Sequence, residues 1–172
     1  MEGPVVEAPP VERARVANAR REKASVRPMS ANHVVAVVAL AASTPEAARW
    51  SRDDYERAGL GDFDGWVATV EEKLVGFVVA RRIADEMEIL NLAVEPAHRR
   101  CGVASRLLKV ALESGRAQGA QRAFLEVRES NTGAITFYQR RGFVRAGRRP
   151  RYYADPLEDA LVLSRSFLES SL

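Results

Sequence analysis

Cysteine and long apolar runs are scarce in this chain. A single cysteine, Cys101, excludes an internal disulfide framework and favours a reducing compartment. The longest uninterrupted apolar run, Val34 to Ala42, is too short to cross a bilayer. The first residues, MEGPVVEAPP, lack the basic end and the apolar core of a secretory signal. These absences predict a cytoplasmic protein with no role at a membrane.

Metal-binding and nucleotide-binding motifs are also missing. The two histidines, His33 and His98, lack the spacing of metal ligands, so we predict no metal site. No glycine-rich turn is followed by Lys-Ser or Lys-Thr, as a nucleoside-triphosphate loop requires. No GxGxxG opens a βαβ unit, which excludes the dinucleotide fingerprint.

The composition is that of one globular domain. The chain has 172 residues, of which 47% are hydrophobic and 28% are charged. Residues 1–24 are rich first in proline and then in Ala, Arg and Glu. We expect them to form an N-terminal extension that is flexible or partly helical. We expect the domain to cover residues 25–168, and residues 169–172 to form a C-terminal tail.

The stretch from Asn91 to Gln118 contains a strand end, a basic turn and a helix. The apolar run Ile89 to Val94 predicts a buried strand, which Pro96 ends because it has no backbone donor. Apolar residues then recur with helical spacing, at Val103, Leu107, Leu108, Ala111, Leu112 and Gly115. The turn places two arginines and small residues at the unpaired N–H groups of the helix start. Such a turn is suited to binding a phosphate group, but a basic loop before an amphipathic helix is equally typical of a solvated turn.

The rest of the chain alternates between further strands and helices. Strands are predicted at residues 25–29, 66–70, 74–82, 86–94, 122–127, 143–149 and 159–167. Helices are predicted at residues 30–42, from 51 onward, and at 103–118 and 131–141. Residues 59–65 and 150–158 are predicted to be connections.

The lengths of the connections predict how the strands pair. Residues 71–73 and 84–85 are short enough for hairpins, so the strands that they join should be antiparallel neighbours. A helical crossover separates the strands that end at Val94 and Val127, so these two should be parallel. We expect an α/β fold with a mixed, mostly antiparallel sheet and flanking helices. The parallel pair should splay at its carboxyl ends and form a cleft there.

Two side chains near that cleft could transfer protons. Glu126 stands in an apolar strand, where a carboxylate is costly unless its face is wet or functional. On this evidence alone, Glu126 fits an exposed-face glutamate at least as well as a catalytic base. Tyr138 follows Ala134 and Ile135 at the spacing of a core helix, so the pattern alone favours a packing role.

Positive charge is concentrated in one stretch. The formal net charge is +3, but residues 139–151 carry six arginines and no acid. This stretch could meet RNA, a ribosome surface or the adenosine phosphate of a cofactor. The stretch has no aromatic residues placed to stack on bases and no known nucleic-acid recognition motif. This favours a solvated helix end and hairpin over dedicated DNA or RNA binding.

Three segments resemble one known family. The loop Arg99-Arg100-Cys101-Gly102-Val103-Ala104 resembles the R/Q-x-x-G-x-G/A signature with which GCN5-related N-acetyltransferases (GNAT) hold the pyrophosphate of coenzyme A. LEVRESNTGAITFYQRRGF, from Leu125 to Phe143, resembles a block of the RimI-type enzymes, which acetylate the N-terminal alanine of a small-subunit ribosomal protein. RRPRYYADPLEDA, from Arg148 to Ala160, resembles their last hairpin. The resemblance covers about residues 26–166 and implies the GNAT acyl-CoA N-acyltransferase fold.

The resemblance also implies a role for each matching residue. Glu126 would be the general base, and Tyr138 would donate a proton to the departing thiolate. Acetyl-CoA would be held by Leu92, Ala93, Val94, Arg99, Arg100, Cys101, Gly102, Val103, Ala104, Ser105 and Asn131. Two positions depart from the family: Cys101 replaces a polar loop residue, and Leu40-Ala41-Ala42 stand where relatives often carry an acid near the peptide pocket.

These roles predict direct acetyl transfer from acetyl-CoA to a protein N-terminal amine, with a ribosomal protein as the expected partner. At pH 7 an α-amino group with a pKa of about 7.8 is roughly 10% neutral, whereas lysine, at about 10.4, is below roughly 0.1% neutral. An N-terminal amine therefore needs only modest help from a base such as Glu126. Two alternatives stay open: transfer to a small amine or a lysine side chain, and a non-catalytic acyl-CoA-binding or ribosome-associated module.

Overall fold

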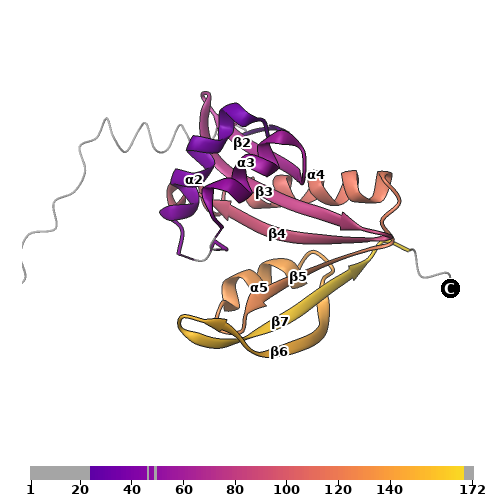
Figure 1. Cartoon of the computed structure of the whole chain (residues 1–172). Helices are drawn as coiled ribbons and strands as arrows, with labels where there is room; N and C mark the ends of the chain where they lie inside the picture. The colour runs from indigo at the N-terminus through magenta and orange to yellow at the C-terminus, as the bar shows by residue number, and fades with distance from the viewer. Residues whose placement is uncertain (1–23, 46, 49, 169–172) are drawn as a thin grey trace, which may run out of the picture.

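Seven strands of the described chain form one sheet, which helices cover on both faces (Figure 1). The structure is a computed structural model that describes residues 24–45, 47–48 and 50–168. The strands lie in the order β1-β2-β3-β4-β5-β7-β6. Residues 1–23 of the expected N-terminal extension, and the expected tail at 169–172, lie outside the described residues.

The first half of the domain is an antiparallel sheet of four strands, with helices between its first and second strands. β1 (Ser25–Pro28), β2 (Asp64–Val70), β3 (Lys73–Ile83) and β4 (Glu86–Val94) pair in chain order, each antiparallel to the next. The helix expected at residues 30–42 is a 3-10 turn, η1 (Ala31–His33), followed by α2 (Val34–Ala42).

The second helix of this half begins as predicted but ends later. Before α3 (Arg52–Leu60), the Ser51 hydroxyl accepts a hydrogen bond from the Asp54 N–H and caps the helix. Because α3 continues to Leu60 and β2 begins at Asp64, the connection predicted at residues 59–65 is wrong at both ends.

The second half of the domain supplies the parallel strand and the last hairpin. After η2 (Pro96–His98), α4 (Val103–Ala117) crosses over to β5 (Arg122–Arg128), which runs parallel to β4. α5 (Thr132–Gln139) follows, and β6 (Val144–Ala154) then pairs with β7 (Leu157–Ser166). β7 lies between β5 and β6, so β6 is an edge of the sheet. A mixed, mostly antiparallel sheet with one parallel pair and flanking helices is thus confirmed.

The long connection predicted at residues 150–158 is wrong. β6 continues through this segment to Ala154, and only Asp155 and Pro156 separate it from β7. Proline usually ends a central strand, but on an edge strand its missing N–H can face outward, where no neighbouring strand needs it. The register shifts between Arg149 and Tyr153, so that residues 150–152 stand opposite a single residue of β7.

The helices cover both faces because alternate residues of a strand point to opposite sides. Val78 and Ala80 of β3 belong to the core cluster that contains the apolar face of α4. Phe77 and Val79 of the same strand belong to the cluster formed with α2 and α3. α4 lies very close to β4, since a Cβ at Gly115 would collide with the sulfur of a β4 methionine.

The parallel pair parts at a bulge in β4. Ile89 and Asn91 pair with consecutive residues of β3, so Leu90 is an extra residue on β4. The pairing of β4 with β5 ends at the same place, with Ile89 opposite Leu125. Figure 1 shows the two strands diverging toward their carboxyl ends. The predicted splay is therefore confirmed, and it starts at the bulge.

Candidate active site

The parted ends of β4 and β5 carry much of the predicted site. Beyond the last β4–β5 pair, β4 continues through Leu92, Ala93 and Val94, and β5 continues through Glu126. Ala93 and Val94 are only 4% and 8% exposed, so their side chains belong to the core. The backbone of this segment is the part that a ligand could meet.

The turn before α4 presents backbone N–H groups near the carboxyl end of β4. Gly102 is the N-cap of α4 with φ 79°, and Arg100 also has a positive φ of 60°. A Cβ at Gly102 would meet no atom of the described structure within 4 Å, so the space beside this backbone is open. Between described residues, the Arg106 N–H bonds to the Gly102 carbonyl, whereas the N–H groups of residues 101–105 have no backbone acceptor. The turn is therefore able to bind an anion.

Side chains brace this turn against β4 and α5. The Arg99 Nε donates to the Val94 carbonyl at 3.3 Å, and the Cys101 thiol donates to the Arg99 carbonyl at 3.4 Å. In the first turn of α4, the Ser105 hydroxyl accepts a hydrogen bond from Arg141. The structure thus gives Arg99, Cys101 and Ser105 contacts that fix the shape of the turn.

Arg141 links the two helices that frame the site, and sequence reasoning missed it. Its guanidinium donates to the Phe137 carbonyl at 2.7 Å, lies 3.7 Å from the centre of the Phe137 ring, and reaches the Ser105 hydroxyl. Burial, with the nearby Arg140 charge, lowers the pKa of Arg141. In the sequence, Arg141 is one of several arginines that follow α5, and this pattern does not identify its partners.

Glu126 has two partners from β6. Its Oε1 lies 2.7 Å from the Arg149 Nε, and its side chain is 12% exposed. The Tyr152 hydroxyl donates to the same carboxylate, and this hydrogen bond, followed by burial, raises the pKa of Tyr152 to about 12. Tyr152 is therefore protonated at physiological pH. Sequence reasoning missed both partners, although the paired tyrosines of the last hairpin were a signal.

Tyr138 lies on α5 and is buried in the core. It is 8% exposed, and its ring centre lies 5.1 Å from that of Phe137 and 5.5 Å from that of Phe143. Burial raises the pKa of Tyr138 strongly, while the Arg141 charge acts in the opposite direction. The phenol is therefore a hydrogen-bond donor at every pH at which the protein would work.

Glu126 and Tyr138 lie on opposite sides of β5. Leu125 and Val127 belong to the core cluster that includes Tyr138, and Glu126 alternates with them along the strand. The structure therefore does not bring the two groups into contact with each other.

Asn131 holds the start of α5. Its side-chain oxygen accepts a hydrogen bond from the Ala134 N–H at 3.1 Å, which caps the helix. Among the described residues, its side-chain nitrogen has no acceptor, so the two N–H groups on that nitrogen can donate to a ligand.

A buried polar cluster that sequence reasoning missed ties the α2–α3 connection to the β4 bulge. Asn91, which follows the extra residue of the bulge, is 5% exposed. Its oxygen accepts from the Ala48 N–H at 3.1 Å, and its nitrogen donates to the Tyr55 hydroxyl at 2.9 Å. Burial raises the pKa of Tyr55 to about 12. The signal was a lone asparagine inside an apolar run.

The described ranges contain neither a metal-binding cluster nor a membrane-spanning helix. These residues contain no group of three or more His, Cys, Asp or Glu side chains that could hold a metal ion. His98 instead lies with its Nδ1 2.8 Å from the Glu95 carboxylate. Within the same part of the chain, no helix is both long and apolar enough to cross a bilayer.

Comparison with known families accounts for this arrangement. The model of the acetyltransferase (GNAT) family matches residues 35–143, from α2 to the residue before β6. The chain belongs to the GNAT family. The match includes the turn before α4, Glu126 and Tyr138. At the level of the family, the expected enzyme class, an acetyl-CoA-dependent N-acetyltransferase, is confirmed.

Two curated relatives carry closely similar descriptions. The chain is 34% identical over 98 residues to the [ribosomal protein bS18]-alanine N-acetyltransferase of Escherichia coli K12, a match that covers 56% of this chain and 66% of that enzyme. It is 30% identical over 148 residues to a putative [ribosomal protein bS18]-alanine N-acetyltransferase of Bacillus subtilis 168, covering 83% of this chain and 95% of that one. The RimI-type resemblance is confirmed as a similarity to these proteins.

Solved structures of GNAT proteins share the fold. The crystal structure of the ribosomal-protein-S18-alanine N-acetyltransferase from E. coli superposes with a TM-score of 0.75 at 25% identity, covering 87% of this chain and 99% of that one. Arabidopsis thaliana NAA60 in complex with acetyl-CoA superposes with a TM-score of 0.76 at 19% identity, covering 84% and 99% of the two chains. The second comparison supports the fold alone.

Proposed function

We propose that this GNAT chain transfers the acetyl group of acetyl-CoA to the α-amino group of a protein N-terminus by direct attack in a ternary complex. The favoured acceptor is the N-terminal alanine of a small-subunit ribosomal protein, in the cytoplasm. One observation carries the proposal: β4 and β5 part after Ile89 and Leu125. Beyond that point β5 carries the Glu126 carboxylate, and β4 leads through a turn to the N-terminus of α4. The descriptions of the curated relatives support the acceptor.

Acetyl-CoA would lie along the parted edge of β4. The backbone of Leu92, Ala93 and Val94 offers hydrogen bonds to the amide groups of the pantetheine arm, as a strand does to an added strand. The N–H groups of the turn from Arg100 to Ser105, together with the positive end of α4, would hold the pyrophosphate. Asn131 would donate from its side-chain nitrogen to the cofactor.

The acceptor amine must lose a proton as it attacks the thioester. Glu126 would take this proton, directly or through a water molecule. Its surroundings suit a carboxylate, because Arg149 forms an ion pair with it and the Tyr152 hydroxyl donates to it. Neither partner covers it completely, since 12% of the side chain is exposed.

Tyr138 would act on the leaving sulfur. Because burial raises its pKa, full transfer of its proton to a thiolate whose conjugate acid has a pKa of about 8.5 is unfavourable. The predicted role is therefore refined: in the proposal, the phenol donates a hydrogen bond that stabilises the negative charge developing on the sulfur.

Acetylation of defined peptides tests the acceptor. The protein is mixed with acetyl-CoA and three acceptors: a lysine-free peptide with N-terminal alanine, the same peptide with a blocked N-terminus and one lysine, and a polyamine. Mass spectrometry should show an acetyl group on the alanine peptide, formed at a higher kcat/KM than on either alternative. A preference for lysine or polyamine would overturn the proposed acceptor.

A matched pair of variants tests whether the chain is a catalyst or only a binding module. Glu126→Gln should lower kcat by roughly 100-fold, the lower end of general-base contributions, while the Kd for acetyl-CoA stays within about 2-fold. Glu129→Gln is the control, because that carboxylate is paired with Arg148 instead of lying between the parted strands. Binding of acetyl-CoA without any acetylated product would favour the non-catalytic alternative.

A further inference from the structure

The pair formed by Glu126 and Arg149 joins two strands that are not neighbours. β7 lies between β5 and β6, and Arg149 reaches across it to place its Nε 2.7 Å from the Glu126 Oε1. Opposite Arg149 on β7 stands Ala160, which is fully buried and whose small side chain leaves room for this crossing. The sheet thus places a permanent positive charge beside the proposed base.

The register shift in β6 adds Tyr152 to the same side. Arg149 and Tyr152 both contact Glu126, although residues three apart on a regular strand point to opposite faces. Arg151, with φ 53°, provides the necessary turn of the backbone. The guanidinium of Arg149 lies 5.6 Å from the centre of the Tyr152 ring. The irregular segment therefore brings both side chains to one carboxylate.

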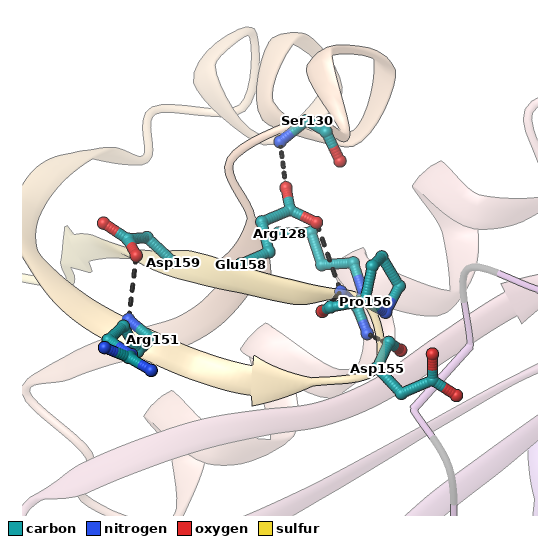
Figure 2. A network of polar contacts seen from close by, with 7 residues as sticks. All are labelled: Arg128, Ser130, Arg151, Asp155, Pro156, Glu158 and Asp159. Carbon is teal, nitrogen blue, oxygen red and sulfur yellow. Dashed lines mark hydrogen bonds and ion pairs between the residues drawn. The ribbon is translucent and has the colours of Figure 1, made fainter.

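The irregular segment is fixed by acids of β7. Figure 2 shows the Asp159 carboxylate accepting a hydrogen bond from the Arg151 N–H, at 2.8 Å. The other Asp159 oxygen lies 2.8 Å from the Arg148 Nε. Glu158 accepts from the Ser130 N–H at 2.6 Å and lies 3.1 Å from Arg128. The position of Arg149 is thus set by the hairpin, before any acceptor binds.

A cation approaching Glu126 would have to compete with this arginine. An ionised amine is attracted by a free carboxylate, but it is repelled by a guanidinium already paired with that carboxylate. A neutral amine meets no such repulsion. At pH 7 a lysine side chain is almost entirely ionised, whereas roughly 10% of an α-amino group is neutral. Because Arg149 repels only the ionised form, it should hinder a lysine side chain more than an α-amino group.

We propose that Arg149 is a specificity-determining residue that disfavours cationic acceptors, such as lysine side chains and polyamines, relative to protein N-termini. The inference rests on the proposed function, since it assumes that the acceptor amine approaches Glu126. It also supplies a reason for α-amine selectivity that does not depend on reading the acceptor's side chains.

Arg149→Gln and Arg148→Gln form a matched pair for the test. Both arginines are exposed residues of β6, but Arg148 pairs with Glu129 and Asp159 and not with Glu126. For each variant, kcat/KM is measured with the lysine-free alanine peptide and with the N-terminally blocked peptide that contains one lysine. Arg149→Gln should raise the ratio of lysine to α-amine acetylation about 5- to 10-fold, mainly through a lower KM for the lysine peptide. Arg148→Gln should leave the ratio unchanged.

Arg149→Lys distinguishes an effect of charge on acceptor choice from a purely structural effect. This variant keeps the charge but loses the planar guanidinium, so the ratio should stay within about 2-fold of the wild-type ratio. A general loss of folding would lower both activities and leave the ratio unchanged. If Arg149→Gln keeps the wild-type ratio, or if Arg149→Lys changes it as much as Arg149→Gln does, Arg149 does not select acceptors by charge. If the wild type itself prefers the lysine peptide, the proposed function fails first and the inference fails with it.

Discussion

The Asn91 side chain donates a hydrogen bond to the Tyr55 hydroxyl across 2.9 Å, and this contact joins the bulge of β4 to α3. The same amide group also contacts the backbone of Ala48, between α2 and α3. The strand irregularity from which β4 and β5 part is therefore attached to the helices on one face of the sheet. Stability and the shape of the site depend here on the same side chain.

Asn91→Leu should destabilise the fold by about 2–4 kcal/mol, because it removes two hydrogen bonds to the Ala48 backbone and leaves the buried Tyr55 hydroxyl without its Asn91 partner. Tyr55→Phe is the control, since it removes only one hydroxyl and should cost about 1 kcal/mol. Denaturant unfolding of both variants gives the comparison. Equal losses would show that the Ala48 contacts contribute nothing.

Gly102→Ala should weaken acetyl-CoA binding by about 10-fold or more beyond any effect on stability. Gly102 and Gly119 both have positive φ, 79° and 94°, and a Cβ at either meets no described atom within 4 Å. Each alanine therefore carries a similar backbone cost of about 1 kcal/mol. Only Gly102 lies at the N-terminus of α4, where its new methyl group would point into the proposed phosphate site. Calorimetric Kd values that change equally in both variants would argue against that site.

Tyr138→Phe should lower kcat by roughly 100-fold, the loss expected when one donor to a developing anion is removed. The ring contacts with Phe137 and Phe143 are kept, so the melting temperature should change little. Because burial raises the pKa of Tyr138, the wild-type enzyme should lose no activity from ionisation of this phenol as the pH rises toward 10. Steady-state rates across this range would reveal an inactive ionised form if the assignment is wrong.

Glu158→Gln should lower stability at neutral pH and have little effect in acid. The Ser130 hydrogen bonds, followed by Arg128, lower the pKa of Glu158 in the folded protein. A lowered folded-state pKa gives stability above the unfolded pKa, about 4.3, and that stability is lost as the pH falls through the folded-state value. Melting temperatures at pH 7 and pH 3 therefore test the sign. Glu71→Gln, at an exposed turn, controls for the change in net charge.

The sequence predicted the elements whose signals are local. The spacing of apolar residues located α4, and Ser51 and Asn131 marked the starts of two helices through their capping side chains. The crossover helix required the parallel pair, and the structure has it. The candidate carboxylate, Glu126, was found because it is a polar residue in an apolar strand.

The contacts of Glu126 could not be predicted, because they depend on strand order and on a register shift. Pro150 indicated a strand end, yet β6 continues past it as an edge strand. Only once β6 is placed beyond β7, with three residues opposite one, do Arg149 and Tyr152 reach Glu126. Similarly, Asn91 is an isolated polar residue in an apolar run, and its partner Tyr55 can be identified only once the bulge and α3 are placed.

The exposed edge of β6 has a further consequence for solubility. Its outer side could otherwise serve as a template for a strand from another molecule. The edge is interrupted twice by register shifts, contains Pro150, and carries Arg145, Arg148, Arg149 and Arg151. Irregular backbone, a missing donor and repelling charges each discourage intermolecular β-pairing. Replacing these arginines with valine or threonine would therefore favour aggregation even where catalysis survived.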